Sequence, residues 1–306
     1  MIMISQPNPI KVESIDQFNR YFRQPTLHPL VSVADLSHAD LSLFEPTDFG
    51  MYCVVLMDID FGELILRGTC MRYRAGTIFT MKPGEVVSMH LDPNVHPRGF
   101  MLAFRPELIQ NTGLGRDFYM FNFFDYEVFE ALELHETERR VMLNCFANIN
   151  AELHAPDDEL TGHMLRLGIG HMLSYCRRYY DRQFDTRTLK NSDLVKKLNA
   201  LLDNCLSNPE LTHKIGQPTV AWCASQFHLT PNYFGDMVKR ELHTTAQEFI
   251  QNKIVERAKS LIADPNNSIN DVAEQLGFAY PNHFTRFFRT KTNMSPTEFR
   301  KTLKDL

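Results

Sequence analysis

A repeat near the C-terminus constrains the fold of this chain more than any other feature of its sequence. Residues 229–234 (Leu-Thr-Pro-Asn-Tyr-Phe) align with residues 279–284 (Ala-Tyr-Pro-Asn-His-Phe). Further upstream, Thr219 aligns with Ser268 after a shift of one residue in the turn. A repeat of this kind indicates one supersecondary unit used more than once. The C-terminal part of the chain is therefore predicted to hold two copies of one motif.

Each copy is predicted to form a helix, a tight turn and a second helix. The first helix begins at an N-cap, Thr219 in one copy and Ser268 in the other, because a hydroxyl can accept an N–H of the first turn. Ser268 and Asp271 have the spacing of a capping box. Gly277 can take the left-handed conformation that ends a helix, and a proline opens each second helix.

One helix is predicted between the copies, over Ala246–Ala263. At 1.5 Å per residue it would be about 27 Å long. Successive major-groove faces of B-DNA repeat every ~34 Å. A spacer of this length can place two reading helices in successive turns on one side of a duplex.

Residues 190–306 resemble the DNA-binding domain of AraC-type (AraC/XylS) transcription regulators. The resemblance is carried by residues 273–278 (Ala-Glu-Gln-Leu-Gly-Phe), 282–284 (Asn-His-Phe), 287–289 (Phe-Phe-Arg) and 294–300 (Met-Ser-Pro-Thr-Glu-Phe-Arg). It implies an all-α domain with two helix-turn-helix motifs joined by a long helix, and double-stranded DNA as partner. A helical domain without a DNA role would not need two turn motifs at this spacing.

The resemblance places base contacts on the outward face of the second helix of copy two. Arg286 can bond a guanine with two hydrogen bonds, and Asn282 can bond an adenine. Residues further along the helix are better placed for phosphates, which position a protein without specifying sequence. The predicted base-facing residues are Asn282, His283, Thr285 and Arg286, and the predicted phosphate contacts are Arg289 and Lys291.

Copy one departs from this pattern. Its outward set is Asn232, Tyr233, Gly235 and Asp236. Glycine has no side chain to contact a base, and a carboxylate repels phosphate although it can accept from a cytosine amino group. We therefore expect copy two to carry most of the specificity. The base-facing candidates in copy one are Asn232 and Asp236, and the phosphate candidates are Thr230, Lys239 and Arg240.

The distribution of charge also changes near residue 190, where the resemblance begins. Residues 1–189 hold 17 Lys and Arg against 25 Asp and Glu, and residues 190–306 hold 15 against 12. An acidic body with a faintly basic tail suggests two functions. We place a regulatory or dimerisation domain at 1–189 and the DNA-binding domain at 190–306.

The front domain is predicted to be α+β, with a cupin-like β-barrel over about 25–110 and helices over about 125–182. Short β-type runs separated by turns are typical of a barrel or sandwich. They lie at 51–57, 64–67, 77–81, 86–89 and 100–104. Residues 76–84 resemble a hairpin of the barrels that AraC-type regulators carry.

Two amphipathic helices are predicted after the barrel, over Glu136–Leu153 and Thr161–Tyr180. They resemble the family's dimerisation element, which implies a homodimer formed through about 136–182. The alternative is that they only cover the barrel.

A cupin fold raises the possibility of a metal enzyme, whose chemistry needs converging His and carboxylate ligands. The usual His-x-His is absent, and neither the His90 and His96 pair nor the His28 and His38 pair has a clear third partner. We therefore expect no catalytic residue, no metal and no cofactor.

An apolar effector is the other possible content of the barrel. The predicted lining, for which ordinary core packing is the alternative, is Phe79, Met81, Met89, Met101 and Phe104.

Three functions remain. The first is a DNA-binding transcription regulator whose front domain senses a small molecule, dimerises, or does both, with RNA polymerase as a further partner if it is an activator. The second is a regulator without an effector, and the third is a cupin enzyme with an accessory DNA module. We expect a cytoplasmic location without a membrane, because no apolar run nears the ~18 residues of a span, no signal peptide opens the chain, and the six Cys lack a Cys-x-x-Cys pair.

Overall fold

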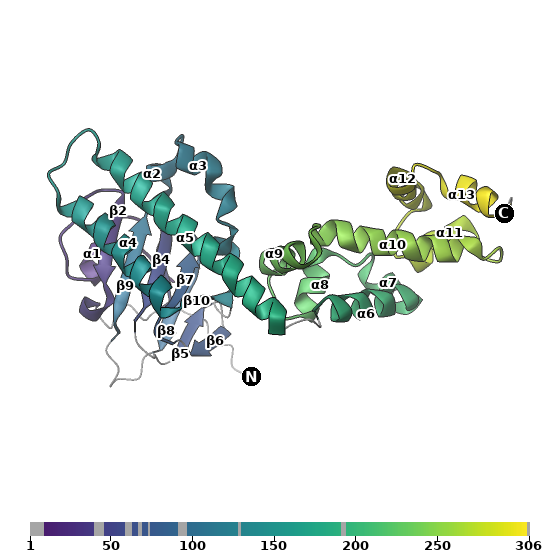
Figure 1. The fold of residues 1–306 in the computed structure, drawn as a ribbon, viewed down its shortest axis with the longest axis horizontal. Coiled ribbons are helices and arrows are strands. Elements are labelled where there is room, and N and C mark those ends of the chain that lie inside the picture. The colour runs from purple at the N-terminus through teal and green to yellow at the C-terminus, as the bar shows by residue number, and fades with distance from the viewer. Residues whose placement is uncertain are drawn as a thin grey trace. The chain divides into compact units, whose positions relative to one another are not determined.

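The computed structural model describes residues 9–39, 46–58, 63–66, 69–72, 74–90, 97–127, 130–190 and 194–304. The chain divides into two compact units, Met1–Gln183 and Phe184–Leu306. The first unit holds β-sheets and helices, and the described part of the second unit is helical (Figure 1). The predicted mixed class, with strands in front and a helical C-terminal domain, is confirmed.

The strands of the first unit form two five-stranded sheets. In order across the sheet, the first consists of β1 (Ile10–Lys11), β3 (Thr47–Asp48), β8 (Val86–His90), β5 (Glu63–Leu66) and β6 (Thr69–Arg72). The second consists of β10 (Leu132–Glu133), β7 (Thr77–Met81), β4 (Tyr52–Met57), β9 (Gly99–Phe104) and β2 (Val31–Asp35). All neighbours in the second sheet are antiparallel.

The first unit has a core between its sheets. Strand residues alternate between the two faces of a sheet. Val55 of β4 pairs in register with Phe79 of β7 and with Met101 of β9, and these three side chains are buried in one cluster. Val87 of the first sheet and Phe18 of α1 (Ile15–Tyr21) join the same cluster.

The other face of the second sheet is covered by helices. Phe100 of β9 contacts Phe146 of α4 (Glu136–His154), with ring centroids 5.8 Å apart. The long helix α5 (Thr161–Lys190) follows α4 and extends ten residues beyond its predicted end at Tyr180. Along the chain, short helical turns follow β9 and precede β10. They are α2 (Pro106–Ile109), α3 (Gly113–Asp117), η3 (Phe118–Met120) and η4 (Asn122–Asp125), while η1 (Leu36–His38) follows β2.

The second unit is built from eight described helices. They are α6 (Leu194–Ser207), α7 (Pro209–Ile215), α8 (Val220–Gln226), α9 (Pro231–Leu242), α10 (Ala246–Ala263), α11 (Ile269–Gln275), α12 (Pro281–Thr292) and α13 (Pro296–Lys304). The pairs α8–α9 and α11–α12 are the two copies of the sequence repeat, and α10 has the predicted bounds. One apolar cluster, which includes Phe234, Ile254 and Phe284, runs through both copies. The second unit therefore has a continuous core.

Candidate nucleic-acid interface

Helix α12 has one buried face and one exposed polar face. Phe284 and Phe288 are fully buried and hold the inner face in the core of the second unit. Their spacing of four residues leaves the opposite side of the helix in solvent. The predicted base-facing residues Asn282, His283 and Arg286 are exposed, as are the predicted phosphate contacts Arg289 and Lys291, whereas Thr285 is half-buried.

The turn before α12 fixes the direction of this face. Gly277 lies at φ 77°, in the left-handed region that favours glycine. Its amide and that of Phe278 donate to carbonyls of α11, and the Phe278 ring packs edge-on against Phe284. At the other end of α11, Ser268 and Asp271 form the predicted capping box, with both bonds present at 2.8 and 3.1 Å. The start of α12 is thus held by local backbone bonds of the preceding turn and by the core.

Copy one repeats this geometry with different side chains. His228 takes the left-handed position of the turn at φ 55°. Thr230 caps α9, because its hydroxyl oxygen accepts the Tyr233 amide at 3.2 Å. Asn232 and Lys239 are exposed, and Asp236, Arg240 and Thr230 are half-buried.

The outward placement of Tyr233 is wrong. Its side chain is 1% exposed, and its ring lies 4.9 Å from that of Phe184 at the start of the second unit. An aromatic ring of this size gains much by burial in apolar contacts, which outweighs the outward position that the helix periodicity gives Tyr233. The outward face of copy one is therefore narrower than that of copy two, and no atom would contact a Cβ added at Gly235.

Two arginine side chains form hydrogen bonds between α10 and neighbouring helices. Arg300 of α13 donates to the carbonyl oxygens of Ile262 at 3.0 Å and Asn267 at 2.7 Å. Arg257 of α10 donates to the Leu206 carbonyl at 3.3 Å. These bonds satisfy carbonyls at or after the ends of α10 and α6, where no further turn of helix can do so.

Tyr280 is an exposed residue that the sequence analysis did not select. It stands immediately before Pro281, is 64% exposed, and its ring lies 5.4 Å from that of His283. The sequence signal that could have identified it is a tyrosine directly before the proline that opens a helix with a polar face.

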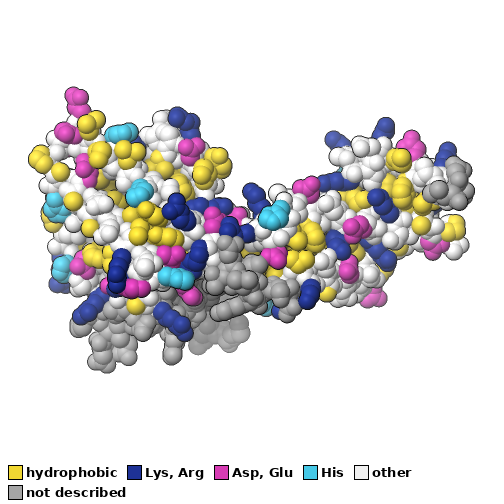
Figure 2. Space-filling model, viewed as in Figure 1, with side chains coloured by type: hydrophobic (Ala, Val, Ile, Leu, Met, Phe, Trp, Pro, Cys, Tyr) yellow, Lys and Arg dark blue, Asp and Glu magenta, His cyan; other side chains and the backbone are white. Residues whose placement is uncertain are grey.

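Charge on the second unit is mixed. Figure 2 shows Lys and Arg side chains distributed over its visible face, with Asp and Glu among them. The excess of only three positive charges in residues 190–306 agrees with this picture. The second unit would therefore bind a polyanion through individual side chains placed on α12. A strong overall positive field would contribute little.

The predicted effector-lining residues do not all share one face. Phe79, Met81 and Met101 lie in the core between the sheets. Phe104 points to the opposite face, where its ring packs on Tyr52 at 5.4 Å, because it is three residues from Met101 in a strand of alternating faces. Met89 lies in β8, opposite Leu64, and its side chain is outside the described part.

A pocket of the first unit lies elsewhere. It is formed between the segment from Gln24 to Val33 and the end of α4 at Asn150, Leu153 and His154. Nearby, the His28 Nδ1 accepts the Leu30 amide at 3.1 Å, and burial lowers the pKa of His28. None of the predicted effector-lining residues borders this pocket.

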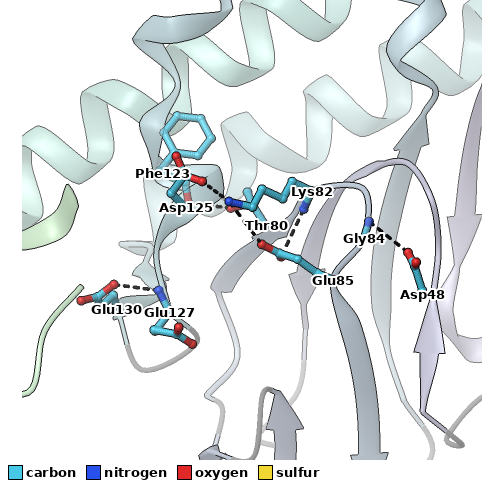
Figure 3. Close-up of polar contacts among 9 residues, drawn as sticks. All are labelled: Asp48, Thr80, Lys82, Gly84, Glu85, Phe123, Asp125, Glu127 and Glu130. Carbon is cyan, nitrogen blue, oxygen red and sulfur yellow. Dashed lines mark hydrogen bonds and ion pairs between the residues drawn. The ribbon is translucent and has the colours of Figure 1, made fainter. Parts of the chain in front are cut away.

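Polar contacts hold the β7–β8 turn of the first unit in place (Figure 3). The Thr80 hydroxyl donates to the Phe123 carbonyl at 2.9 Å, and Lys82 forms an ion pair with Asp125. On the other side, the Gly84 amide donates to Asp48 at 3.1 Å. These bonds join the turn to neighbouring structural elements.

The described residues contain no group of three or more His, Cys, Asp or Glu that could hold a metal ion. His96 lies outside the described residues, as does the side chain of His90. Among the helices that the structure describes, none is both long and apolar enough to span a membrane.

Family models match both units. A helix-turn-helix domain matches residues 223–302, and an AraC-like ligand-binding domain matches residues 62–162. Both units are therefore similar to domains of known families, and the match over the first unit is to an AraC-like protein. The first match covers α9 and α12, and the second covers most of the strands and the helix α4.

Curated relatives of this chain are named as transcription regulators. The chain is 28% identical over 155 residues to the HTH-type regulator YfiF of Bacillus subtilis, covering 50% of this chain and 46% of that protein. It is 30% identical over 78 residues to the HTH-type transcriptional activator RhaS of Escherichia coli, covering 26% of this chain and 28% of that one. The chain thus spans less than half the length of these relatives.

Solved structures also align. The DNA-binding domain of AdpA in complex with a target DNA is 18% identical, with 36% of this chain and 92% of that one covered at a TM-score of 0.31. ToxT of Vibrio cholerae with a bound unsaturated fatty acid is 14% identical, with 90% and 96% covered at a TM-score of 0.30. These scores are too low to carry an argument about the present chain.

Proposed function

We propose that this chain is a sequence-specific DNA-binding transcription regulator of the AraC type. The observation that carries the proposal is the outer face of α12. Its polar side chains are exposed while Phe284 and Phe288 fix the helix from behind. A helix held in this way can enter the major groove without the loss of its own packing.

Arg286 and Asn282 are proposed to read bases, since guanidinium and amide groups match the edges of guanine and adenine. His283 and Thr285 complete the base-facing set, and Tyr280 adds an apolar ring beside them. Arg289 and Lys291 are proposed to bind phosphates. In copy one, Asn232 and Asp236 face the bases, and Thr230, Lys239 and Arg240 bind the backbone.

The first unit is proposed to pair two chains through α5. Leu160, Met164 and Leu167 follow one another at helical spacing and are 62%, 47% and 55% exposed. Exposed apolar residues grouped on one helix face mark interaction surfaces. Figure 2 shows hydrophobic side chains in solvent on the visible face of this unit. We propose that this exposed apolar surface binds a second copy of the chain.

The match to an AraC-like ligand-binding domain supports a small-molecule effector for the first unit. The proposal assigns the chain no catalytic activity, since its curated relatives are named as transcription regulators. A cytoplasmic location is proposed, with RNA polymerase as a further partner if the chain activates transcription.

The proposal is tested by retention of genomic DNA. Purified full-length protein is incubated with sheared genomic DNA of its source at fixed, near-physiological salt, because phosphate contacts make affinity steeply dependent on salt. The retained fragments are then sequenced. We expect one enriched motif. Retention without enrichment, both with and without a cell extract as source of effectors, would contradict sequence-specific binding.

A further inference from the structure

Helix α7 leads into copy one along the chain but packs against copy two. It precedes copy one in the chain, yet it packs against α11 of copy two as well as against α6. Thr212 of α7 is fully buried, and its hydroxyl donates to the Gln275 carbonyl of α11 at 2.7 Å. The copies are therefore held together by the shared core around α10 and, in addition, by the contact of α7 with α11.

The contact continues as a close approach of two backbones. Gly216 follows α7 at φ 74°, and Gly277 lies in the turn of copy two at φ 77°. A Cβ placed on Gly277 would lie 2.6 Å from the carbonyl carbon and 2.7 Å from the oxygen of Gly216. Real Cβ atoms do not approach that closely, so the position excludes every residue with a side chain unless the backbones move apart. The fit depends on glycine at this crossing.

An additional attachment restricts how the two copies can move relative to one another. Both copies already pack with α10 in one apolar cluster. The buried Thr212 hydrogen bond and the close approach of Gly216 and Gly277 lie outside α10 and restrict rotation between the copies further. The rotation matters for DNA because one additional base pair moves an element by about 3.4 Å and turns it by about 35° around the duplex. A protein with fixed copies discriminates between such spacings, and one with mobile copies does not.

We propose that α7 is a clamp that sets the spacing of the two DNA elements read by this protein. Thr212, Gly216 and Gly277 are positioning residues. In this proposal they fix the recognition helices, α9 of copy one and α12 of copy two, and do not themselves touch DNA. The proposal rests on the proposed DNA-binding function, and it deepens that function by assigning spacing selectivity to residues outside both recognition helices.

The main variant is Thr212→Val, which keeps the shape of the side chain and removes the hydroxyl. Thr212→Ser restores a hydroxyl and is the conservative rescue. Thr302→Val is the matched control, because the Thr302 hydroxyl donates to the Phe299 carbonyl within its own helix. Circular dichroism and thermal unfolding establish that each variant is folded.

Binding is measured with full-length protein on duplexes that carry the enriched elements at spacings from two base pairs shorter to two longer. We expect Thr212→Val to lose roughly threefold to tenfold in affinity at the best spacing, the range of one hydrogen bond. It should lose less at the other spacings, so its profile is flatter. Thr212→Ser and Thr302→Val should keep the wild-type profile. An unchanged profile for Thr212→Val, or an equal loss at every spacing, would overturn the clamp.

A measurement without DNA separates the two proposals. Spin labels are attached at Gln226→Cys on α8 and Thr297→Cys on α13, both exposed positions, with Cys70 replaced by serine. We expect one narrow distance distribution that Thr212→Val broadens and Thr212→Ser does not. Equal widths would overturn the clamp, whereas narrow widths with no selective DNA binding would contradict only the proposed function.

Discussion

Individual side chains of α12 differ in what they can contribute to recognition. Arg286 is exposed on the outer face and presents a planar fork that fits the major-groove edge of guanine. Arg289 lies about one helical turn further along, where a phosphate contact adds affinity without sequence preference. The equivalent of Arg286 in copy one is Asp236, whose charge is of the opposite sign.

Replacement of Arg286 tests this assignment. We expect Arg286→Ala to lose about 1–3 kcal/mol of binding to its site and little of its binding to unrelated DNA. Arg286→Lys should restore the loss only in part, since an ammonium group lacks the planar, rigid fork of the guanidinium. Lys197→Ala, an exposed cation on α6, is the charge control. Fluorescence anisotropy at fixed salt measures all three. Binding of Arg286→Ala within about twofold of wild type would remove Arg286 from the base-reading set.

The helix ends of the second unit were largely predictable from residues adjacent in the sequence. The capping hydroxyls at Thr219 and Ser268, the left-handed Gly277 and the bounds of α10 were all predictable, because each depends on neighbouring residues only. Helix α7 was missed although its signals are present. Asn208 caps it, Pro209 opens it and Gly216 follows it, but the same Asn and Pro also fit the end of α6.

Long-range packing explains what sequence patterns did not predict. Tyr233 occupies a position that should face outward, and a ring from a residue about fifty positions away buries it. The strand pattern of β9 predicted its bounds almost correctly, but the assignment of Phe104 to the same interior as Met101 ignored the alternation of faces. The contact of Gly216 with Gly277 has no sequence signature at all.

The capping box of α11 predicts a pH dependence. The hydrogen bonds from Ser268 hold the pKa of Asp271 below its usual value. A carboxyl group with a depressed pKa in the folded state adds stability above its unfolded pKa, near 4, and loses it as the pH falls through the folded value. The stability advantage of wild type over Asp271→Asn should therefore shrink as the pH falls from 7 towards 3.

Urea unfolding at several pH values measures this difference. Asp264→Asn is a suitable control, since Asp264 caps no helix N-terminus. A difference between wild type and Asp271→Asn that stays constant over the whole range would show that the carboxylate contributes nothing to the cap.

The whole molecule combines a surface for pairing with a surface for DNA. If α5 pairs two chains, replacement of its exposed apolar residues with charges should separate them, because a carboxylate in an apolar interface is costly to bury. We expect the double variant Met164→Glu, Leu167→Glu to sediment as a monomer at micromolar concentrations where wild type is a dimer. Leu303→Glu, an exposed leucine of the second unit, is the control. A monomeric wild type, or a double variant that remains dimeric, would contradict pairing through α5.

Two unequal helices, α12 and α9, are proposed to read DNA together, and selection from a random duplex library measures what each of them reads. Full-length wild type and Arg286→Ala are each carried through the selection at one salt concentration. We expect wild type to enrich two elements about 10 base pairs apart. Arg286→Ala should lose the sequence preference in the stronger element and retain the weaker one. Enrichment of the same sequence by both proteins, or of none by wild type, would contradict reading of DNA by these two helices.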